Sequence, residues 1–250
     1  MIKSIISKVI SKETIHRLLG DVKIIITNPL TENGIYYVHD DEDFMKGYAM
    51  IMGPSDTPYF GGYFFFELTY PCDYPHSPPK VTYHTNGDNI RFNPNLYKCG
   101  KVCISMLNTW RGEQWTSCQT ISTVLLTLCT LLCKDPLLNE PGITNNHLEF
   151  QKYTDIIEYK SLDVACLQML QRKSSVFLNK FHIFYPNMKE EFAKNADLIG
   201  NILEKKKEMP AEVLTTGIYS MKVSINYAEL YTLFLETKKM TLSEKNEINK

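Results

Sequence analysis

Residues 63–84 read YFFFELTYPCDYPHSPPKVTYH, and this stretch decides the fold class. Its aromatic and apolar start, Tyr63 to Thr69, predicts a buried β-strand, and Lys80 to His84 predicts a second strand. The prolines between them cannot donate ladder hydrogen bonds, so Tyr70 to Pro79 is expected to form an irregular, rigid crossing that can hold a cis proline bond. The stretch therefore predicts the second half of a β-sheet.

Two apolar runs before this stretch, Val22 to Ile26 and Tyr48 to Met52, predict two further strands. Asn-Pro, Gly-Pro-Ser-Asp and Gly-Gly turns separate the runs, which favours a four-stranded antiparallel meander. Apolar residues recur at helical spacing before them, so the first twenty residues are expected to form one amphipathic helix that ends at Gly20.

The rest of the chain shows helical periodicity. Thr120 is expected to cap a helix with an apolar face from Ile121 to Leu132, stopped at Asp135-Pro136. The later expectations are helices over about 148–172 and 177–207 with a break at Tyr185-Pro186, a linker over 210–217, a packed segment over 218–235 and a frayed tail. The predicted fold class is α+β, with a principal domain over residues 1–172 and a helical C-terminal extension over 173–250.

Composition limits the function classes. The chain has 250 residues, 44% of them hydrophobic, so it can bury one sizeable core. Lys plus Arg number 27 against 28 Asp plus Glu, and the resulting net charge of −1 disfavours nucleic acid and anionic membranes as partners. The longest apolar run, Val124 to Cys133, is too short to span a bilayer. We therefore expect a soluble cytoplasmic or nuclear protein.

The seven cysteines include no Cys-x-x-Cys pair. Their odd number argues against a disulfide framework and favours a reducing compartment. Cys129 and Cys133 lie four residues apart in a Leu-rich helical pattern, where cysteine usually behaves as a small buried hydrophobe. We expect no metal site and no bound cofactor.

Cys103 ends the run Phe92-Asn93-Pro94-Asn95-Leu96-Tyr97-Lys98-Cys99-Gly100-Lys101-Val102-Cys103. The run is rich in Asn, Gly and Pro, which places this thiol on a loop. A thiolate can attack a thioester carbonyl, and the Asn95 carboxamide can hold the negative oxygen that forms when an amine displaces the acyl group. The residues alone leave bland alternatives open, because a loop cysteine is usually an ordinary thiol and Asn95 can simply form a turn.

A longer series of residues carries a resemblance to a known family: Ile51-Met52-Gly53-Pro54, Asp56, Tyr59, Gly61-Gly62, Phe64, Tyr74-Pro75, Pro78-Pro79-Lys80-Val81, Asn93-Pro94-Asn95, Gly100, Val102-Cys103, Trp115 and Ile121. In this order they resemble the core of a ubiquitin-conjugating enzyme. Phe92 to Asn95, Cys103 to Ser105, the Trp110 and Trp115 pair, and Asn139 to Gly142 are most similar to the Z-type members.

The resemblance implies a four-stranded antiparallel sheet flanked by an N-terminal helix and later helices. It implies that Cys103 accepts ubiquitin or a ubiquitin-like modifier as a thioester from an activating enzyme and passes it to a substrate lysine with a ligase's help. ATP would be used by the activating enzyme and not by this chain. Glu140 would be the acid that helps the incoming lysine lose its proton, although the position is equally compatible with a surface residue.

Three departures from the family pattern stand out. Asn93 replaces a histidine that organises the loop in most members, and its amide can reproduce part of that hydrogen bonding. The long interval from Cys103 to Trp115 predicts a lid-like loop over 108–114. Ser117 and Cys118 replace a Pro-Ala pair that, with an aromatic residue here matched by Tyr83, would form the ligase-binding patch.

Smaller, more polar side chains at Ser117 and Cys118 would bury less apolar area, so the ligase interface is expected to be weak.

The first helix carries four lysines, Lys3, Lys8, Lys12 and Lys23. They are either a solvated face or a docking surface for the activating enzyme. Two other function classes stay open: a ubiquitin-binding cofactor of the same fold without chemistry, and a cysteine hydrolase, which would need a histidine to activate the thiol.

Overall fold

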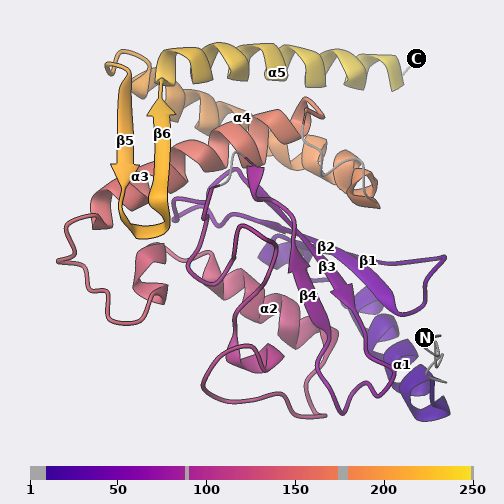
Figure 1. Ribbon diagram of the computed structural model, residues 1–250. Coiled ribbons are helices and arrows are strands. Elements are labelled where there is room, and N and C mark those ends of the chain that lie inside the picture. The colour runs from indigo at the N-terminus through magenta and orange to yellow at the C-terminus, as the bar shows by residue number, and fades with distance from the viewer. Residues whose placement is uncertain (1–9, 88–89, 174–179, 249–250) are drawn as a thin grey trace, which may run out of the picture.

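The computed structural model describes residues 10–87, 90–173 and 180–248 of the chain. The first nine residues of the helix predicted over residues 1–20, with Lys3 and Lys8, lie outside these ranges. Figure 1 shows a four-stranded sheet with helices on both sides and a small β-hairpin near the C-terminal helices. The elements are α1 (Lys12–Thr27), β1 (Ile35–His39), β2 (Lys46–Met52), β3 (Tyr63–Thr69), β4 (Lys80–Tyr83), α2 (Ile121–Leu131), α3 (Phe150–Leu162), α4 (Tyr185–Lys206), β5 (Glu212–Thr216), β6 (Met221–Ile225) and α5 (Tyr227–Ile248).

The sheet is an antiparallel meander in the order β1-β2-β3-β4, as predicted. Tyr48 faces Glu67 across β2 and β3, and Phe66 faces Tyr83 across β3 and β4. The crossing between β3 and β4 contains a cis peptide bond before Pro75.

The prediction of the first strand was wrong. Val22 to Ile26 belongs to α1, which continues through Gly20 and ends at Thr27, before Pro29. Leu18, Val22 and Ile25 are buried along one face of this helix, and their spacing of three and four residues is helical rather than alternating. The first strand is β1, which follows the Gly34 turn, and Ser11 caps α1 through a hydrogen bond from the Thr14 N–H.

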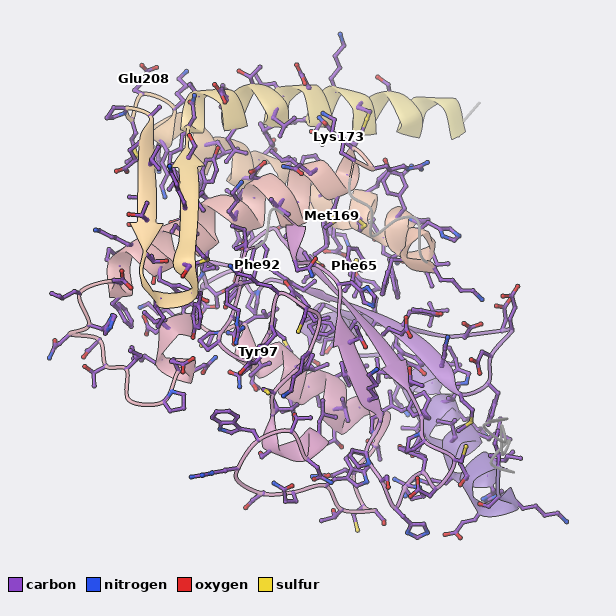
Figure 2. The ribbon with its side chains drawn as sticks, in the orientation of Figure 1. Phe65, Phe92, Tyr97, Met169, Lys173 and Glu208 are labelled. Atoms are coloured by element: carbon purple, nitrogen blue, oxygen red, sulfur yellow. The ribbon has the colours of Figure 1, made fainter. Side chains whose placement is uncertain are left out.

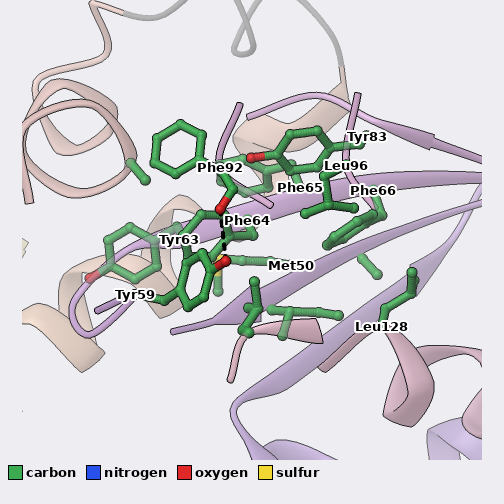
Figure 3. Packing of buried hydrophobic residues seen from close by; sticks show 14 of the residues in the cluster. Met50, Tyr59, Tyr63, Phe64, Phe65, Phe66, Tyr83, Phe92, Leu96 and Leu128 are labelled. Atoms are coloured by element: carbon green, nitrogen blue, oxygen red, sulfur yellow. Dashed lines mark hydrogen bonds between the residues drawn. The ribbon is translucent and has the colours of Figure 1, made fainter. Parts of the chain in front are cut away.

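Aromatic side chains fill the core between the sheet and α2 (Figure 3). The Phe64 ring packs edge-on against Tyr59 and Phe92, with centroid distances of 5.5 and 5.6 Å. The Tyr59 hydroxyl donates to the Phe92 carbonyl at 2.7 Å, drawn as a dashed line in Figure 3. Buried aromatic rings thus fix the start of the loop that leads to Cys103.

The C-terminal extension covers the other face of the sheet. Phe181, in the 3-10 helix Lys180–Phe184, packs against Tyr48 at 5.5 Å and Phe65 at 5.1 Å. The Tyr63 hydroxyl donates to the Met188 carbonyl of α4 at 2.9 Å, and α5 lies along α4 (Figure 1). One hydrophobic cluster therefore contains both the sheet and the extension. The division of the chain at residue 172 stays a prediction.

The predicted linker over 210–217 is instead a strand. β5 pairs with β6 in an antiparallel hairpin, with Leu214 opposite Val223. Met221, Val223 and Ile225 are buried and alternate with exposed residues, which is the period-two pattern of a half-buried strand.

Pro186 lies in the first turn of α4, where its missing N–H costs nothing. The backbone of α5 is helical to Ile248, where the composition had predicted a frayed end.

No helix in the described ranges is long and apolar enough to cross a membrane.

An ion pair links the extension to the loop between β1 and β2. The Lys180 Nζ lies 2.8 Å from Asp40 Oδ1, and this hydrogen bond is the main reason that the pKa of Asp40 lies well below its usual range. The Tyr48 hydroxyl adds a hydrogen bond of 2.9 Å to the same carboxylate. A carboxyl whose pKa is lowered on folding stabilises the fold above its unfolded pKa of about 3.9, and the contribution disappears as the pH falls below that value.

We therefore expect Asp40→Asn to lower the urea midpoint of unfolding at neutral pH. The difference from wild type should shrink as the pH falls below about 4. The matched control is Asp197→Asn, since Asp197 is exposed and pairs with Lys238 on the surface, where ion pairs contribute little. A difference between Asp40→Asn and wild type that is independent of pH would contradict the assignment of this stability to the Asp40 charge.

Candidate functional site

A short, tightly held loop carries Cys103. Leu96 forms isolated bridges with Asn93 and Val102, and the Tyr97 N–H donates to the Lys101 carbonyl at 2.9 Å. Gly100 has a φ of +88°, and an added Cβ there would lie 2.9 Å from the Tyr83 carbonyl oxygen, so glycine is required for the turn. The loop thus returns on itself and brings Asn95 beside Cys103.

The Asn93 side chain organises the start of this loop. Its Nδ2 donates to the Tyr59 hydroxyl at 2.9 Å and to the Leu131 carbonyl at 2.8 Å, and its Oδ1 accepts from the Asn95 N–H at 2.9 Å. The amide is fully buried and has partners at both ends. The Asn93 amide therefore holds the loop by hydrogen bonds, which is the role expected for it in place of the family's histidine.

Asn95 and Cys103 are joined by a reciprocal pair of hydrogen bonds. The Cys103 N–H donates to the Asn95 carbonyl at 2.9 Å, and Asn95 Nδ2 donates to the Cys103 carbonyl at 2.6 Å. One amide N–H of Asn95 thus fixes the backbone of Cys103, and an amide group has a second N–H. The turn-forming role of Asn95 agrees with these contacts, and its role toward an oxyanion stays a prediction.

The thiol itself is covered. Cys103 is only 3% exposed, and its Sγ lies 3.5 Å from the Thr109 carbonyl oxygen. The Thr109 hydroxyl accepts from the Ile104 N–H at 2.9 Å and lies 3.0 Å from the Val102 carbonyl. Trp110, further along this segment, is largely exposed. The predicted lid-like loop over 108–114 thus folds over the Cys103 sulfur through Thr109.

A groove runs beside the covered thiol. It has a volume of about 430 Å³ and is lined, among others, by Pro79, Thr82, Gly100, Val102, Leu107 and Thr109. Val102 precedes Cys103, and Thr109 is the residue that contacts its sulfur. The groove therefore reaches the residues that flank the thiol, which places the thiol close to the surface.

Glu140 follows a 3-10 helix, Pro136–Asn139, and its carboxylate accepts a hydrogen bond from the Tyr219 hydroxyl. Tyr219 lies at the turn of the β5–β6 hairpin, in the extension. This partner was not predicted, because nothing in the local sequence relates two residues so distant along the chain.

The prediction that Tyr83 belongs to a surface patch was wrong. Tyr83 is 1% exposed, and its ring packs against Phe66 at 5.4 Å. It shares the inward face of β4 with Val81, two residues earlier, so the alternation of the strand was the signal that could have corrected the prediction.

Ser117 and Cys118 are both exposed. Arg17 of α1 donates to the Ser117 carbonyl at 2.6 Å, and Trp115 Nε1 donates to the Pro75 carbonyl at 2.6 Å. These bonds bring α1, the proline-rich crossing and the segment over 115–119 to one end of the molecule. His76, next to Pro75, is exposed.

Within the described ranges, no group of three or more His, Cys, Asp or Glu side chains could hold a metal ion. The cysteines in the described ranges form no disulfide with one another, and burial raises the pKa of Cys129 and Cys133. Both residues are only half-buried, and Cys133 lies beyond the end of α2 at Leu131, so neither is the fully buried hydrophobe that the helical pattern predicted.

Comparison with known proteins identifies the family. The family model described as ubiquitin-conjugating enzyme matches residues 17–161, which include the sheet, α2, Cys103 and Glu140. The chain is 40% identical over 168 residues to ubiquitin-conjugating enzyme E2 Z of Danio rerio, covering 66% of this chain and 51% of that protein. It is also 40% identical over 160 residues to ubiquitin-conjugating enzyme E2 Z of Homo sapiens, covering 63% of this chain and 45% of that protein.

A third relative is much longer. The chain is 38% identical over 191 residues to the human dual E2 ubiquitin-conjugating enzyme/E3 ubiquitin-protein ligase BIRC6, a match that covers 70% of this chain and 4% of that protein. The chain thus spans about half the length of the E2 Z relatives it matches, and a small part of BIRC6. Since the family model covers more than half of the residues here, the chain belongs to the ubiquitin-conjugating enzyme family.

Proposed function

We propose that the chain accepts ubiquitin or a ubiquitin-like modifier as a thioester on Cys103 and transfers it to a lysine amine, usually with a ligase. The observation that carries the proposal is the reciprocal hydrogen bonding between Asn95 and Cys103. It keeps the Asn95 carboxamide bound to the backbone of Cys103, in a loop that buried aromatic residues anchor. The family assignment supports a transferase over a non-catalytic binding cofactor or a hydrolase.

The chemistry has two balanced steps. In charging, Cys103 Sγ forms a bond to the carbonyl carbon at the modifier's C-terminus, and the thiolate of the activating enzyme leaves. In transfer, the lysine nitrogen bonds to that carbon, the electron pair of the S–C bond returns to Sγ, and the amine proton goes to a base. The second N–H of Asn95 is the donor we assign to the negative oxygen of the intermediate.

Glu140 is the residue we assign to assist the lysine. Its carboxylate already accepts from Tyr219, but a carboxylate has two oxygens and several acceptor sites. Such help requires one of these sites to come within hydrogen-bond reach of the amine or of a bridging water.

Charging requires the segment over Cys103 to move. Cys103 is 3% exposed and its Sγ lies 3.5 Å from the Thr109 carbonyl oxygen, so a peptide carbonyl has no space on that side. The adjacent groove supplies the approach once Thr109 shifts. We infer that the 108–114 segment restricts which acceptors reach the thioester.

The partners proposed are the modifier, an activating enzyme that consumes the ATP, a ligase and substrate lysines. Lys12 and Lys23 on α1 are exposed, which is compatible with docking of an activating enzyme by complementary charge. Since Tyr83 is buried, the proposed ligase surface consists of the exposed residues Ser117 and Cys118.

The test is a charging assay. The full chain, with an activating enzyme, ATP and ubiquitin, should shift by one ubiquitin mass on a non-reducing gel, and a thiol reductant should reverse the shift. Cys103→Ala should show no shift, whereas Cys99→Ala, which removes an exposed thiol of the same loop, should shift normally. Parallel reactions with ubiquitin-like modifiers and with each class of activating enzyme identify the modifier. A wild-type chain that no combination charges would reject the proposal.

A further inference from the structure

The turn of the β5–β6 hairpin contacts the loop that carries Cys103. Lys98 Nζ donates to the Tyr219 carbonyl at 3.0 Å, and the Tyr219 hydroxyl donates to Glu140. The Tyr219 ring also packs edge-on against the buried Tyr153 of α3 at 5.9 Å. In Figure 2, Phe92 and Tyr97 are labelled on this loop, beside the hairpin. A residue of the extension thus reaches two parts of the proposed site.

Arg91 connects this turn to Asn95. Its guanidinium lies over the Tyr97 ring at 3.5 Å and the Tyr219 ring at 4.9 Å, so two aromatic faces flank it. The same group donates to the Asn93 carbonyl at 3.1 Å and to the Pro94 carbonyl at 2.6 Å. Arg91 is buried, and it fixes the two backbone carbonyls that immediately precede Asn95.

The hairpin turn is held in an uncommon conformation. Tyr219 has φ 60° and Ser220 has φ 48°, and both are in the left-handed region that residues with a Cβ rarely adopt. The Glu149 carboxylate accepts from the N–H groups of Gly217 and Ile218 at 2.6 and 2.9 Å. A turn fixed by α3 in this way presents the Tyr219 ring in one orientation.

We propose that Tyr219 is a positioning residue for the transfer step: its ring holds Arg91, and through Arg91 the carbonyls before Asn95, while its hydroxyl holds the Glu140 carboxylate. The proposal rests on the proposed function of Cys103. It gives the C-terminal hairpin a task beyond packing, because one side chain sets the placement of both the carboxamide and the acid on which transfer depends. Small displacements of such groups are costly in rate.

The experiment separates charging from transfer. Full-length variants are first charged with the modifier, the activating enzyme is stopped by removal of ATP, and single-turnover discharge to free lysine is followed. Tyr219→Leu removes both contacts, and Tyr219→Phe keeps the ring over Arg91 but removes the hydroxyl. Tyr227→Leu is the matched control, because Tyr227 is another tyrosine of the extension that packs on α3, through Tyr159 at 5.3 Å, in contact with neither Arg91 nor Glu140 in the described structure. Tyr227 is buried and Tyr219 is half-buried, so a general packing defect should be at least as large in the control.

The expected result is a selective loss of discharge rather than an equal loss of charging and discharge. Tyr219→Leu should discharge at least about tenfold more slowly than wild type, while the extent of charging stays within about twofold. Tyr219→Phe should discharge faster than Tyr219→Leu, since the ring over Arg91 is kept and only the Glu140 contact is lost. The side-chain amide NMR signals of Asn93 and Asn95 should shift in Tyr219→Leu and much less in Tyr227→Leu.

Two outcomes would overturn the inference while leaving the proposed function intact. One is a Tyr219→Leu discharge rate equal to that of Tyr227→Leu at matched thermal stability. The other is a set of unmoved Asn93 and Asn95 signals. Failure of the wild-type chain to form any thioester would instead reject the function of Cys103 itself, and the amide signals would then still report whether Tyr219 positions the loop.

Discussion

Replacing Asn95 by alanine is expected to slow discharge of the Cys103 thioester to free lysine by about 10²- to 10³-fold, the usual cost of losing one donor to an oxyanion. The physical reason is the second N–H of the carboxamide, which is not needed for the 2.6 Å bond to the Cys103 carbonyl. Charging should change much less, because the loop keeps its other anchors. The measurement is single-turnover discharge of pre-charged protein, with charging recorded separately.

Asn93→Ala is the informative comparison for this prediction. Asn93 is the buried amide of the same loop, and its three hydrogen bonds go to protein groups only, so its loss should destabilise the fold and lower charging and discharge together. Asn95→Ala should lower discharge selectively. If both variants lose charging and discharge in equal proportion, Asn95 acts only as a structural support and the oxyanion role is excluded.

Phe181→Ala is expected to destabilise the whole protein by about 3–5 kcal/mol, the typical cost of deleting a buried phenyl ring. Phe181 is fully buried between the sheet and the extension, against Tyr48, Phe65 and the His84 ring at 4.9 Å. Since the free energy of unfolding of a domain is usually only about 5–15 kcal/mol, the variant should lose a large part of it. Urea unfolding followed by circular dichroism measures the change.

The control for Phe181 is Leu198→Ala on α4. Leu198 is 51% exposed, so its truncation should change stability by no more than about 0.5 kcal/mol. Equal midpoints for the two variants would mean that the extension is not packed on the sheet in solution. A chain cut after Arg172 would leave the same sheet face uncovered, and we expect it to aggregate rather than to charge.

The meander was predictable because three of its strands have strong local signals. Tyr63 to Phe66 are four consecutive aromatic residues, and the structure confirms the predicted bounds of this strand, Tyr63–Thr69. Val22 to Ile26 was misassigned because β-branched residues favour strands only as a weak preference, which burial on a helix face overrides. The strand that was missed, β1, is short and half exposed, so it lacks the apolar run on which the prediction relied.

The site was predictable only as far as it is contiguous in sequence. Asn95 and Cys103 lie in one loop, and their proximity follows from the turn between them. The contact of Tyr219 with Arg91 and Glu140 depends on how α4 and the hairpin return to the core, which no local pattern encodes. Tyr83 shows a different error. Its match to an aromatic residue of the family's ligase-binding patch was given more weight than the alternation of inward and outward positions along β4.

The placement of Tyr219 against Arg91 also has a consequence for biosynthesis. A ribosome adds about 5–20 residues per second, so it needs roughly 10 s to travel from Arg91 to Tyr219. Until then the nascent chain already contains its nucleophile but lacks the ring that completes its surroundings. A newborn molecule could therefore already be charged on Cys103, but it would gain the full rate of transfer only after Tyr219 has been added and the hairpin has folded.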